Sequence, residues 1–188
     1  MIEFEQDMTN QASVELVALL QDIGRRSQVH AHNLPKQVEF LNYWEGILFT
    51  VGGDRLVAPL NEIVEILNYP TSVTMVPGTC SWVRGIANIR GNLLPIIDLQ
   101  AFLGGGTTVP GRRSRVLVVQ HRDVFTGLLV GDTVGMRHFD EAEKADCATT
   151  DAPMANYVTG AFEHEGEIWP VFSMHALAAS PEFLSAAV

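Results

Sequence analysis

The chain has 188 residues, 47% of them hydrophobic and 18% charged, with a formal net charge of −10. This composition is ordinary for one globular domain, or for two small domains that share a core. The acidic balance disfavours binding to nucleic acid, and no apolar run reaches the ~18 residues that direct membrane insertion requires. The first residues, MIEFEQDMTNQ, lack the layout of a signal peptide, so we expect a cytoplasmic protein.

The first predicted element is an amphipathic helix over residues 11–26. Leu16, Leu20 and Ile23 recur at helical spacing, and Ser13 is placed to cap the start. The pattern fades after this helix. We therefore predict an N-terminal helical extension and linker over residues 1–44, and a main domain over residues 45–188. The helix either packs on that domain or offers a second docking site.

From Glu45 onward the hydrophobic period changes from helical to alternating. Two apolar runs around Gly52–Gly53 predict a tight hairpin, because glycine adopts positive φ at little cost. Residues 60–67 are compatible with a helical turn or a third strand. Residues 116–119 and 124–130 predict a second hairpin around a polar dipeptide, and we expect residues 138–153 to form a long exposed acidic loop.

Two copies of one pattern follow each other at an offset of 75 positions, WVRGIANIRGNLLPIIDLQAFL from Trp82 and YVTGAFEHEGEIWPVFSMHALA from Tyr157. Each copy predicts a strand, a glycine turn, a second strand and a short helical turn. The proline in each copy lacks a backbone donor, so we expect it at a barrel edge or strand end. Short strands with glycine turns are typical of barrels. The predicted fold is therefore all-β (mainly β), with two small antiparallel β-barrel subdomains from an internal duplication.

The two copies differ where the fold does not dictate the residue. Asp98 aligns with Ser173, and either side chain can cap a helix. Arg90 aligns with Glu165, so Arg90 is either a partner contact or half of a surface salt bridge. The arginines at 112, 113 and 115 follow a flexible Gly-rich loop and are either a docking patch for an acidic partner or solvated turn residues.

Catalytic motifs are missing from the sequence. It has no Gly-x-Ser-x-Gly elbow, no phosphate loop, no His-Glu-x-x-His and no zinc-spaced Cys/His cluster. We expect a binding module with no catalytic residues, no cofactor and no metal. The alternative is a small β-barrel enzyme or ligand-binding protein that uses a groove between the two halves.

The segments Asn88-Ile89-Arg90-Gly91 and Pro95-Ile96-Ile97-Asp98-Leu99 carry a family resemblance. They resemble the signature of the CheW-like chemosensory coupling proteins, and the similarity extends over residues 45–178. The N-terminal helix and the residue sequence of the first copy resemble the PilI-type adaptor of the type IV pilus, or twitching, chemosensory system. The resemblance implies two five-stranded SH3-like barrels with a groove between them, no enzymatic activity and no cofactor.

The resemblance also implies the partners. These are the cytoplasmic tip of a methyl-accepting chemoreceptor and the regulatory domain of a CheA-type histidine kinase. The family's partner-binding positions fall on Ile63, Glu65, Arg90, Gly91, Val116, Leu117, Gly127 and Gly160. Gly160 is expected in the matching turn of the second barrel. Gln100 stands where the family commonly has arginine, and Gly131–Asp132 reverses the usual Asp-Gly.

Overall fold

The computed structural model describes residues 43–146 and 153–186. The predicted helix at 11–26 lies outside these residues. The described residues form eleven strands and several short helical turns, and no helix among them is both long and apolar enough to span a membrane. The first strand starts at Trp44, one residue before the predicted start of the main domain.

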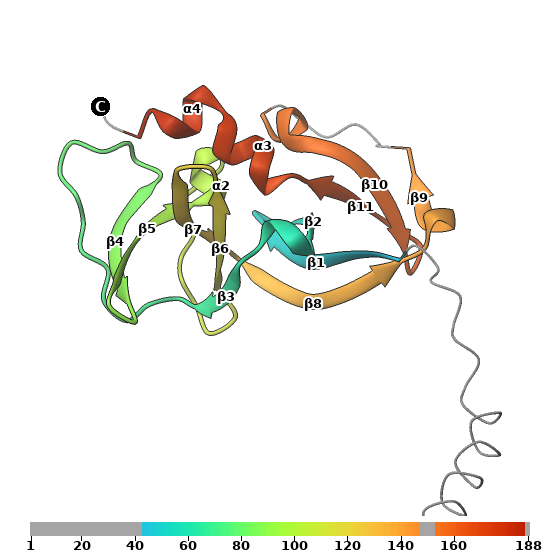
Figure 1. Cartoon of the computed structure of the whole chain (residues 1–188), viewed down its shortest axis with the longest axis horizontal. Coiled ribbons are helices and arrows are strands. Elements are labelled where there is room, and N and C mark those ends of the chain that lie inside the picture. The colour runs from blue at the N-terminus through green and yellow to red at the C-terminus, as the bar shows by residue number, and fades with distance from the viewer. Residues whose placement is uncertain (1–42, 147–152, 187–188) are drawn as a thin grey trace, which may run out of the picture. The chain divides into compact units, whose positions relative to one another are not determined.

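The strands form two sheets (Figure 1). Barrel 1 is the six-stranded sheet, in the order β8-β1-β2-β11-β10-β9, and barrel 2 is the five-stranded sheet, in the order β3-β6-β7-β5-β4. The predicted class, mainly β with two barrel-like subdomains, is confirmed, and the sixth strand of barrel 1 is the two-residue β9. The strands are β1 (Trp44–Val51), β2 (Asp54–Pro59), β3 (Glu65–Asn68), β4 (Val83–Ile89), β5 (Asn92–Asp98), β6 (Arg115–His121), β7 (Val124–Val130), β8 (Asp132–Phe139), β9 (Lys144–Ala145), β10 (Val158–His164) and β11 (Glu167–Phe172).

The chain crosses between the barrels twice. After β2 it passes through the 3-10 turn η1 (Leu60–Glu62) into β3, which pairs with β6 of barrel 2. After β7 it returns in β8, which pairs with β1 of barrel 1. We call β3 and β8 the crossing strands, and each lies at the edge of its sheet. Residues 60–67 thus contain both a helical turn and a strand.

The repeat is confirmed as two hairpins, β4–β5 and β10–β11. Each turns on two residues with positive φ, Arg90 (53°) and Gly91 (89°) in one copy, Glu165 (54°) and Gly166 (77°) in the other. Such two-residue turns match the twist of paired strands. A short helix follows each hairpin, α2 (Leu99–Phe102) or α3 (Met174–Ala179), and α4 (Pro181–Leu184) comes last.

Helix capping also repeats as predicted. Ala101 N donates to Asp98 Oδ1 at 3.2 Å, and Ala176 N donates to Ser173 Oγ at 3.1 Å. Because a carboxylate and a hydroxyl each offer an acceptor oxygen, both satisfy a free N–H at the first turn of the helix.

The barrels are not purely antiparallel, which corrects the prediction. Each repeat hairpin joins a second hairpin through a parallel pair, β5 with β7 and β11 with β2. Pro95 and Pro170 consequently lie inside strands and not at strand ends. Proline is tolerated there because the parallel ladders begin one residue later, at Ile96 and Val171.

Three hydrophobic clusters stabilise this arrangement. The barrel 1 core contains Leu48, Val57, Phe139, Phe162, Trp169 and Val171. The barrel 2 core contains Ala87, Leu94, Ile96, Val116, Val118 and Leu129. A central cluster draws on both sheets and on the helices, and includes Phe49, Leu56, Leu117, Leu128, Phe172 and Leu177. Burial on both faces of β1 and β6 makes the two barrels one packed unit.

The predicted acidic loop at 138–153 is partly wrong. β8 extends to Phe139, which is fully buried, and η2 (Glu141–Glu143) and β9 follow. β8 was not predicted from the sequence. Five of its residues are exposed, so the strand does not alternate between apolar and polar positions.

Candidate functional site

The predicted partner residues Glu65 and Arg90 form an ion pair that joins the crossing strand β3 to the β4–β5 turn. The guanidinium reaches both carboxylate oxygens, with Arg90 Nη2 at 2.7 Å from Glu65 Oε1 and Nη1 at 3.2 Å from Oε2. This two-point geometry orients both groups. The Arg90 side chain is 74% exposed, so the pair itself adds less than about 1 kcal/mol to stability.

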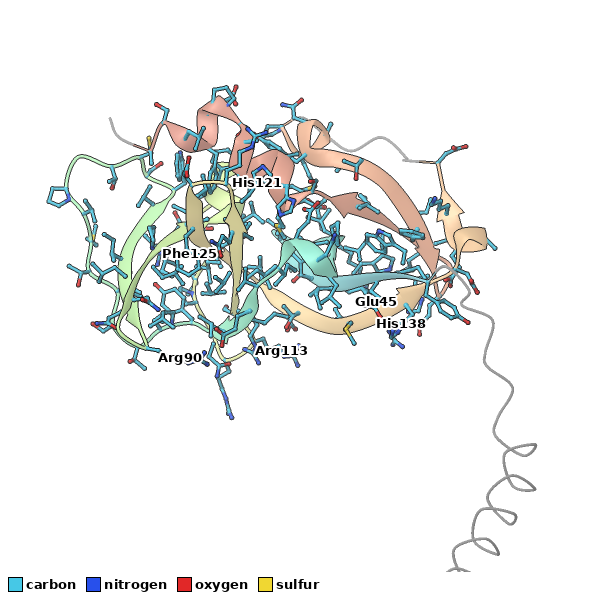
Figure 2. The ribbon with its side chains drawn as sticks, viewed as in Figure 1. Glu45, Arg90, Arg113, His121, Phe125 and His138 are labelled. Carbon is cyan, nitrogen blue, oxygen red and sulfur yellow. The ribbon has the colours of Figure 1, made fainter. Side chains whose placement is uncertain are left out.

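This ion pair lies at one end of the barrel 2 core. The same two residues line a small hollow of about 80 Å³ together with Leu67, Ile89, Leu94, Val118 and Phe125. Figure 2 labels Arg90 and Phe125 on this part of barrel 2. The two alternatives for Arg90 are therefore compatible, because the residue is salt-bridged and most of its side chain is still exposed.

Three of the predicted partner residues are core residues, which is a correction. Val116 and Leu117 are 0% exposed, and Gly127 is buried between them and the repeat hairpin. A Cβ added at Gly127 would lie 2.5 Å from Val116 Cγ1. Since β6 and β7 are packed on both faces, these residues support a surface and do not form it. Ile63 is partly buried and packs against the central cluster.

Gly91 and Gly160 remain accessible. Gly91 N donates to Asn88 Oδ1 at 2.8 Å, which fixes the exposed β4–β5 turn. Gly160 lies inside β10 at a β-bulge, not in the predicted turn. A Cβ at Gly160 would meet nothing within 4 Å, so a side chain or a partner has room there.

The crossing strands carry exposed apolar side chains that the sequence analysis missed. Val64 and Ile66 on the β3 side are 59% and 39% exposed, and Val134 and Met136 on β8 are 59% and 52% exposed. Ile66 shares a sheet face with Leu117 of the central cluster, because the two are register partners. We call these four residues the crossing-strand surface. Apolar edge strands invite association, so such a surface is typical of a protein-docking site.

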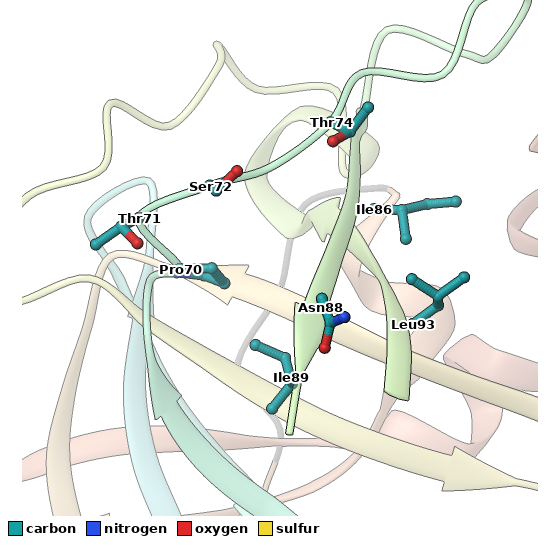
Figure 3. Close-up of a pocket in the computed structure, with 8 residues that line it drawn as sticks. All are labelled: Pro70, Thr71, Ser72, Thr74, Ile86, Asn88, Ile89 and Leu93. Carbon is teal, nitrogen blue, oxygen red and sulfur yellow. The ribbon is translucent and has the colours of Figure 1, made fainter. Parts of the chain in front are cut away.

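Two larger hollows lie within single barrels. A hollow of about 550 Å³ separates the β3–β4 loop from the β4–β5 hairpin (Figure 3). Its walls are aliphatic, hydroxyl and amide groups, which can bind a ligand but cannot transfer protons near neutral pH. The lining residues are Pro70, Thr71, Ser72, Thr74, Ile86, Asn88, Ile89 and Leu93. A hollow of about 380 Å³ beside β9 and β10 includes Trp44, Gly160 and Phe162.

Two histidine side chains, His121 and His175, are in contact where α3 packs near the end of β6. The rings of His121 and His175 have centroids 4.4 Å apart, and Glu62 accepts a hydrogen bond from His175 N at 3.1 Å. Within residues 43–146 and 153–186, no three His, Cys, Asp or Glu side chains are arranged to hold a metal ion. The ring contact and the hydrogen bond join η1, β6 and α3.

Comparisons with known proteins agree with this geometry. Residues 45–182 match the sequence model of the CheW-like domain. Protein PilI of Pseudomonas aeruginosa is 43% identical over 171 residues, covering 90% of this chain and 95% of that protein. Chemotaxis protein CheW of Helicobacter pylori is 32% identical over 111 residues, covering 59% of this chain and 66% of its own length.

The crystal structure of scaffolding protein TtCheW from Thermoanaerobacter tengcongensis shares the fold, with a TM-score of 0.64 at 21% identity. The match covers 74% of this chain and 95% of that one. The resemblance seen in the sequence is thus confirmed by both sequence and fold. Because the domain model spans most of the chain and the P. aeruginosa relative aligns over nearly its whole length, this protein belongs to the CheW-like family of chemosensory coupling scaffolds.

Proposed function

We propose that this protein works in the cytoplasm as a non-catalytic adaptor, and that it couples a methyl-accepting chemoreceptor to a CheA-type histidine kinase in the pathway controlling type IV pili. Family membership and the similarity to Protein PilI support the pathway. An adaptor with two docking faces raises the local concentration of one partner near the other, which requires no reactive group.

One observation carries the proposal. The two strands that cross between the barrels expose apolar side chains at the sheet edges, and Met136 is 52% exposed on the face that it shares with the buried Ile47. Covering four such side chains with a partner removes apolar area from water, which is favourable by about 25 cal/mol per Å² before the costs of association. We assign the receptor tip to this crossing-strand surface.

The Glu65–Arg90 pair gives this surface a polar border. Glu65 is the first residue of β3 and lies between Val64 and Ile66 in the chain, so the ion pair holds the first crossing strand against the β4–β5 turn. We propose that partners contact Arg90 and Gly91 in that turn, and Gly160 at the accessible hollow of barrel 1. Rim charges of this kind set orientation and association rate more than affinity.

Reconstituted signalling tests the proposal. The full chain is combined with a CheA-type kinase and a soluble cytoplasmic fragment of the receptor, and kinase autophosphorylation is measured. We expect Ile66→Lys and Met136→Lys to remove receptor-dependent control. The matched control is Leu184→Lys, because Leu184 is 58% exposed on α4, on the side of the molecule away from β3 and β8 (Figure 1). Normal control by both crossing-strand variants would contradict the assignment.

A charge reversal tests the border. Glu165 shows that glutamate tolerates the same turn conformation in the second repeat, so Arg90→Glu should fold normally. We expect it to weaken the ternary complex, and Glu65→Arg combined with it to restore part of the binding. A folded Arg90→Glu variant with full coupling would exclude Arg90 from the interface.

A further inference from the structure

The loop between α2 and β6 carries a basic cluster in an otherwise acidic protein. The cluster consists of Arg112, Arg113 and Arg115, which fall in a stretch of four residues, whereas the whole chain has a net charge of −10. Arg112 and Arg113 are exposed, and the Arg113 side chain is 87% exposed. Its nearest counterion is Asp132, with Arg113 Nη1 4.0 Å from Asp132 Oδ2, which is too long for a hydrogen bond.

The backbone of this loop is held in place, contrary to the flexible loop predicted from its glycines. At its base, the fully buried Asp98 accepts hydrogen bonds from Thr108 N at 2.8 Å and from Thr108 Oγ1 at 2.7 Å. At its end, Ser114 Oγ accepts from Gly111 N at 2.9 Å. A loop held at both ends presents its side chains with little further loss of conformational entropy on binding.

Arg115 has a different role from its two neighbours. Its Nη1 donates to the carbonyl oxygens of Arg112 and Ser114, each at 2.9 Å. Arg115 therefore supports the backbone that carries Arg112 and Arg113, and its guanidinium is less available to a partner. The pair Arg112 and Arg113 is the part of the cluster that can bind.

The arginine pair lies at one end of the apolar row on β8. Asp132 is the first residue of β8, and Val134 and Met136 follow on the same strand. At the rise of an extended strand, Met136 is about 13 Å from Asp132. At the other end of β8, His138 Nε2 is 2.8 Å from Glu45 Oε1. Figure 2 shows Arg113 and His138 near opposite ends of the strand.

A helix fits this row better than an added strand does. The β1–β8 ladder shifts register between Leu48 and Phe49, and Gly135 in β8 has a φ of 143°. A bulge of this kind interrupts the regular edge that an incoming strand would need. The exposed apolar and basic side chains therefore form the contact, and two turns of a helix span about 11 Å, close to the length of the row.

We propose that Arg112 and Arg113 form a carboxylate-binding anchor beside the crossing-strand surface, and that the partner docked there is an amphipathic helix. Its apolar side chains cover Val134 and Met136, and an acidic side chain about two turns away binds the arginines. Guanidinium groups suit this role because their paired donors match a carboxylate. This inference rests on the proposed function and specifies which end of β8 receives the acidic side chain of the receptor helix.

The test compares two arginine reversals in the full chain. Arg113→Glu removes the anchor, and Arg122→Glu makes the same charge change in the β6–β7 turn, at the far end of β6. Arg122 has the same φ as Arg90, 53°, a conformation that Glu165 already adopts. Binding to the soluble receptor fragment is measured by calorimetry. We expect Arg113→Glu to weaken binding about fivefold to tenfold and Arg122→Glu to change it less than about twofold.

Salt and a compensating change sharpen the result. Raising NaCl from about 50 mM to about 500 mM should weaken the wild type more than Arg113→Glu, because salt screens the anchor. An acidic-to-arginine substitution in the receptor helix should restore binding to Arg113→Glu. Equal effects of the two reversals, or no effect of Arg113→Glu, would overturn the anchor.

The remaining outcomes separate the anchor from the proposed function. If the wild type does not bind the receptor fragment, the proposed function fails. If the wild type binds and Arg113→Glu binds equally well, only the anchor fails. If Arg113→Glu instead weakens binding to the kinase, or self-association measured by light scattering, while receptor binding stays intact, the assignment to a receptor helix is overturned.

Discussion

Replacement of two glycines by alanine distinguishes a core position from a surface position among the predicted partner residues. Gly127 lies in β7 between two packed strands, and an added Cβ would lie 2.5 Å from Val116 Cγ1 and 3.1 Å from both Ile96 Cδ1 and Leu94 Cδ2. Gly160 lies in β10, where an added Cβ would meet nothing within 4 Å. The same one-methyl change therefore meets two opposite environments.

The structure sets the size of each effect. At Gly127 the methyl must displace valine, which is stiff at χ1 and 0% exposed, so overpacking costs about 1–3 kcal/mol. Part of this cost is offset because alanine restricts the unfolded chain, which stabilises by about 0.4–1 kcal/mol. We expect Gly127→Ala to lower the free energy of unfolding by about 1–2 kcal/mol. Gly160→Ala should leave it unchanged or raise it by up to about 1 kcal/mol.

Urea denaturation of the full chain, followed by tryptophan fluorescence and circular dichroism, measures both values. Thermal melts should agree with the urea data. For a chain of this size we expect the Tm of Gly127→Ala to fall by about 2–8 °C and that of Gly160→Ala to stay within about 3 °C of the wild type. Receptor and kinase binding, measured well below Tm, should survive in Gly127→Ala. A Gly127→Ala protein of full stability that no longer binds its partners would refute the placement of Gly127 in the core.

Four substitutions test the fold around the site. Asp98→Ala leaves buried donors in the arginine-bearing loop without partners and should lower the free energy of unfolding by about 3 kcal/mol. Ser173→Ala, at the matching repeat position, removes a cap hydroxyl that also donates to the Glu62 carboxylate at 3.2 Å, and should cost about 1–2 kcal/mol in the same urea titration. Phe183→Ala removes a 6% exposed ring stacked on Trp82 and should cost about 3 kcal/mol, seen as a lower urea midpoint. Arg90→Glu breaks an exposed ion pair and should change stability by less than about 1 kcal/mol in thermal melts, and a larger loss would show that the pair is structural.

Local structure was predictable because neighbouring residues determine it. Gly52–Gly53 and the paired glycines of the repeat predicted hairpin turns, since few residues adopt positive φ. Asp98 and Ser173 predicted helix caps, since a short acceptor side chain before a helix satisfies a free N–H. The duplication itself was visible because both copies need the same residues at the same turns.

The pairing of distant strands was not predictable from these signals. The parallel pairs β5–β7 and β2–β11 join separate hairpins, and the strands within residues 65–130 build barrel 2 while those within residues 44–59 and 132–172 build barrel 1. The strand β8 was missed because a bulge and Gly135 remove its alternation. No pattern within a single strand reveals which neighbour it will meet.

The amino-acid sequence alone determined the family, the duplication, the hairpins and the caps, because each depends on residues close together in the chain. Only the tertiary structure decided which aliphatic side chains are exposed to a partner. Leu117 lies in a predicted strand and Ile66 in a segment compatible with a helical turn or a strand, yet Leu117 is 0% exposed and Ile66 is 39% exposed. The difference arises because β6 has a strand on each side and packs on both faces, whereas β3 crosses to a sheet edge.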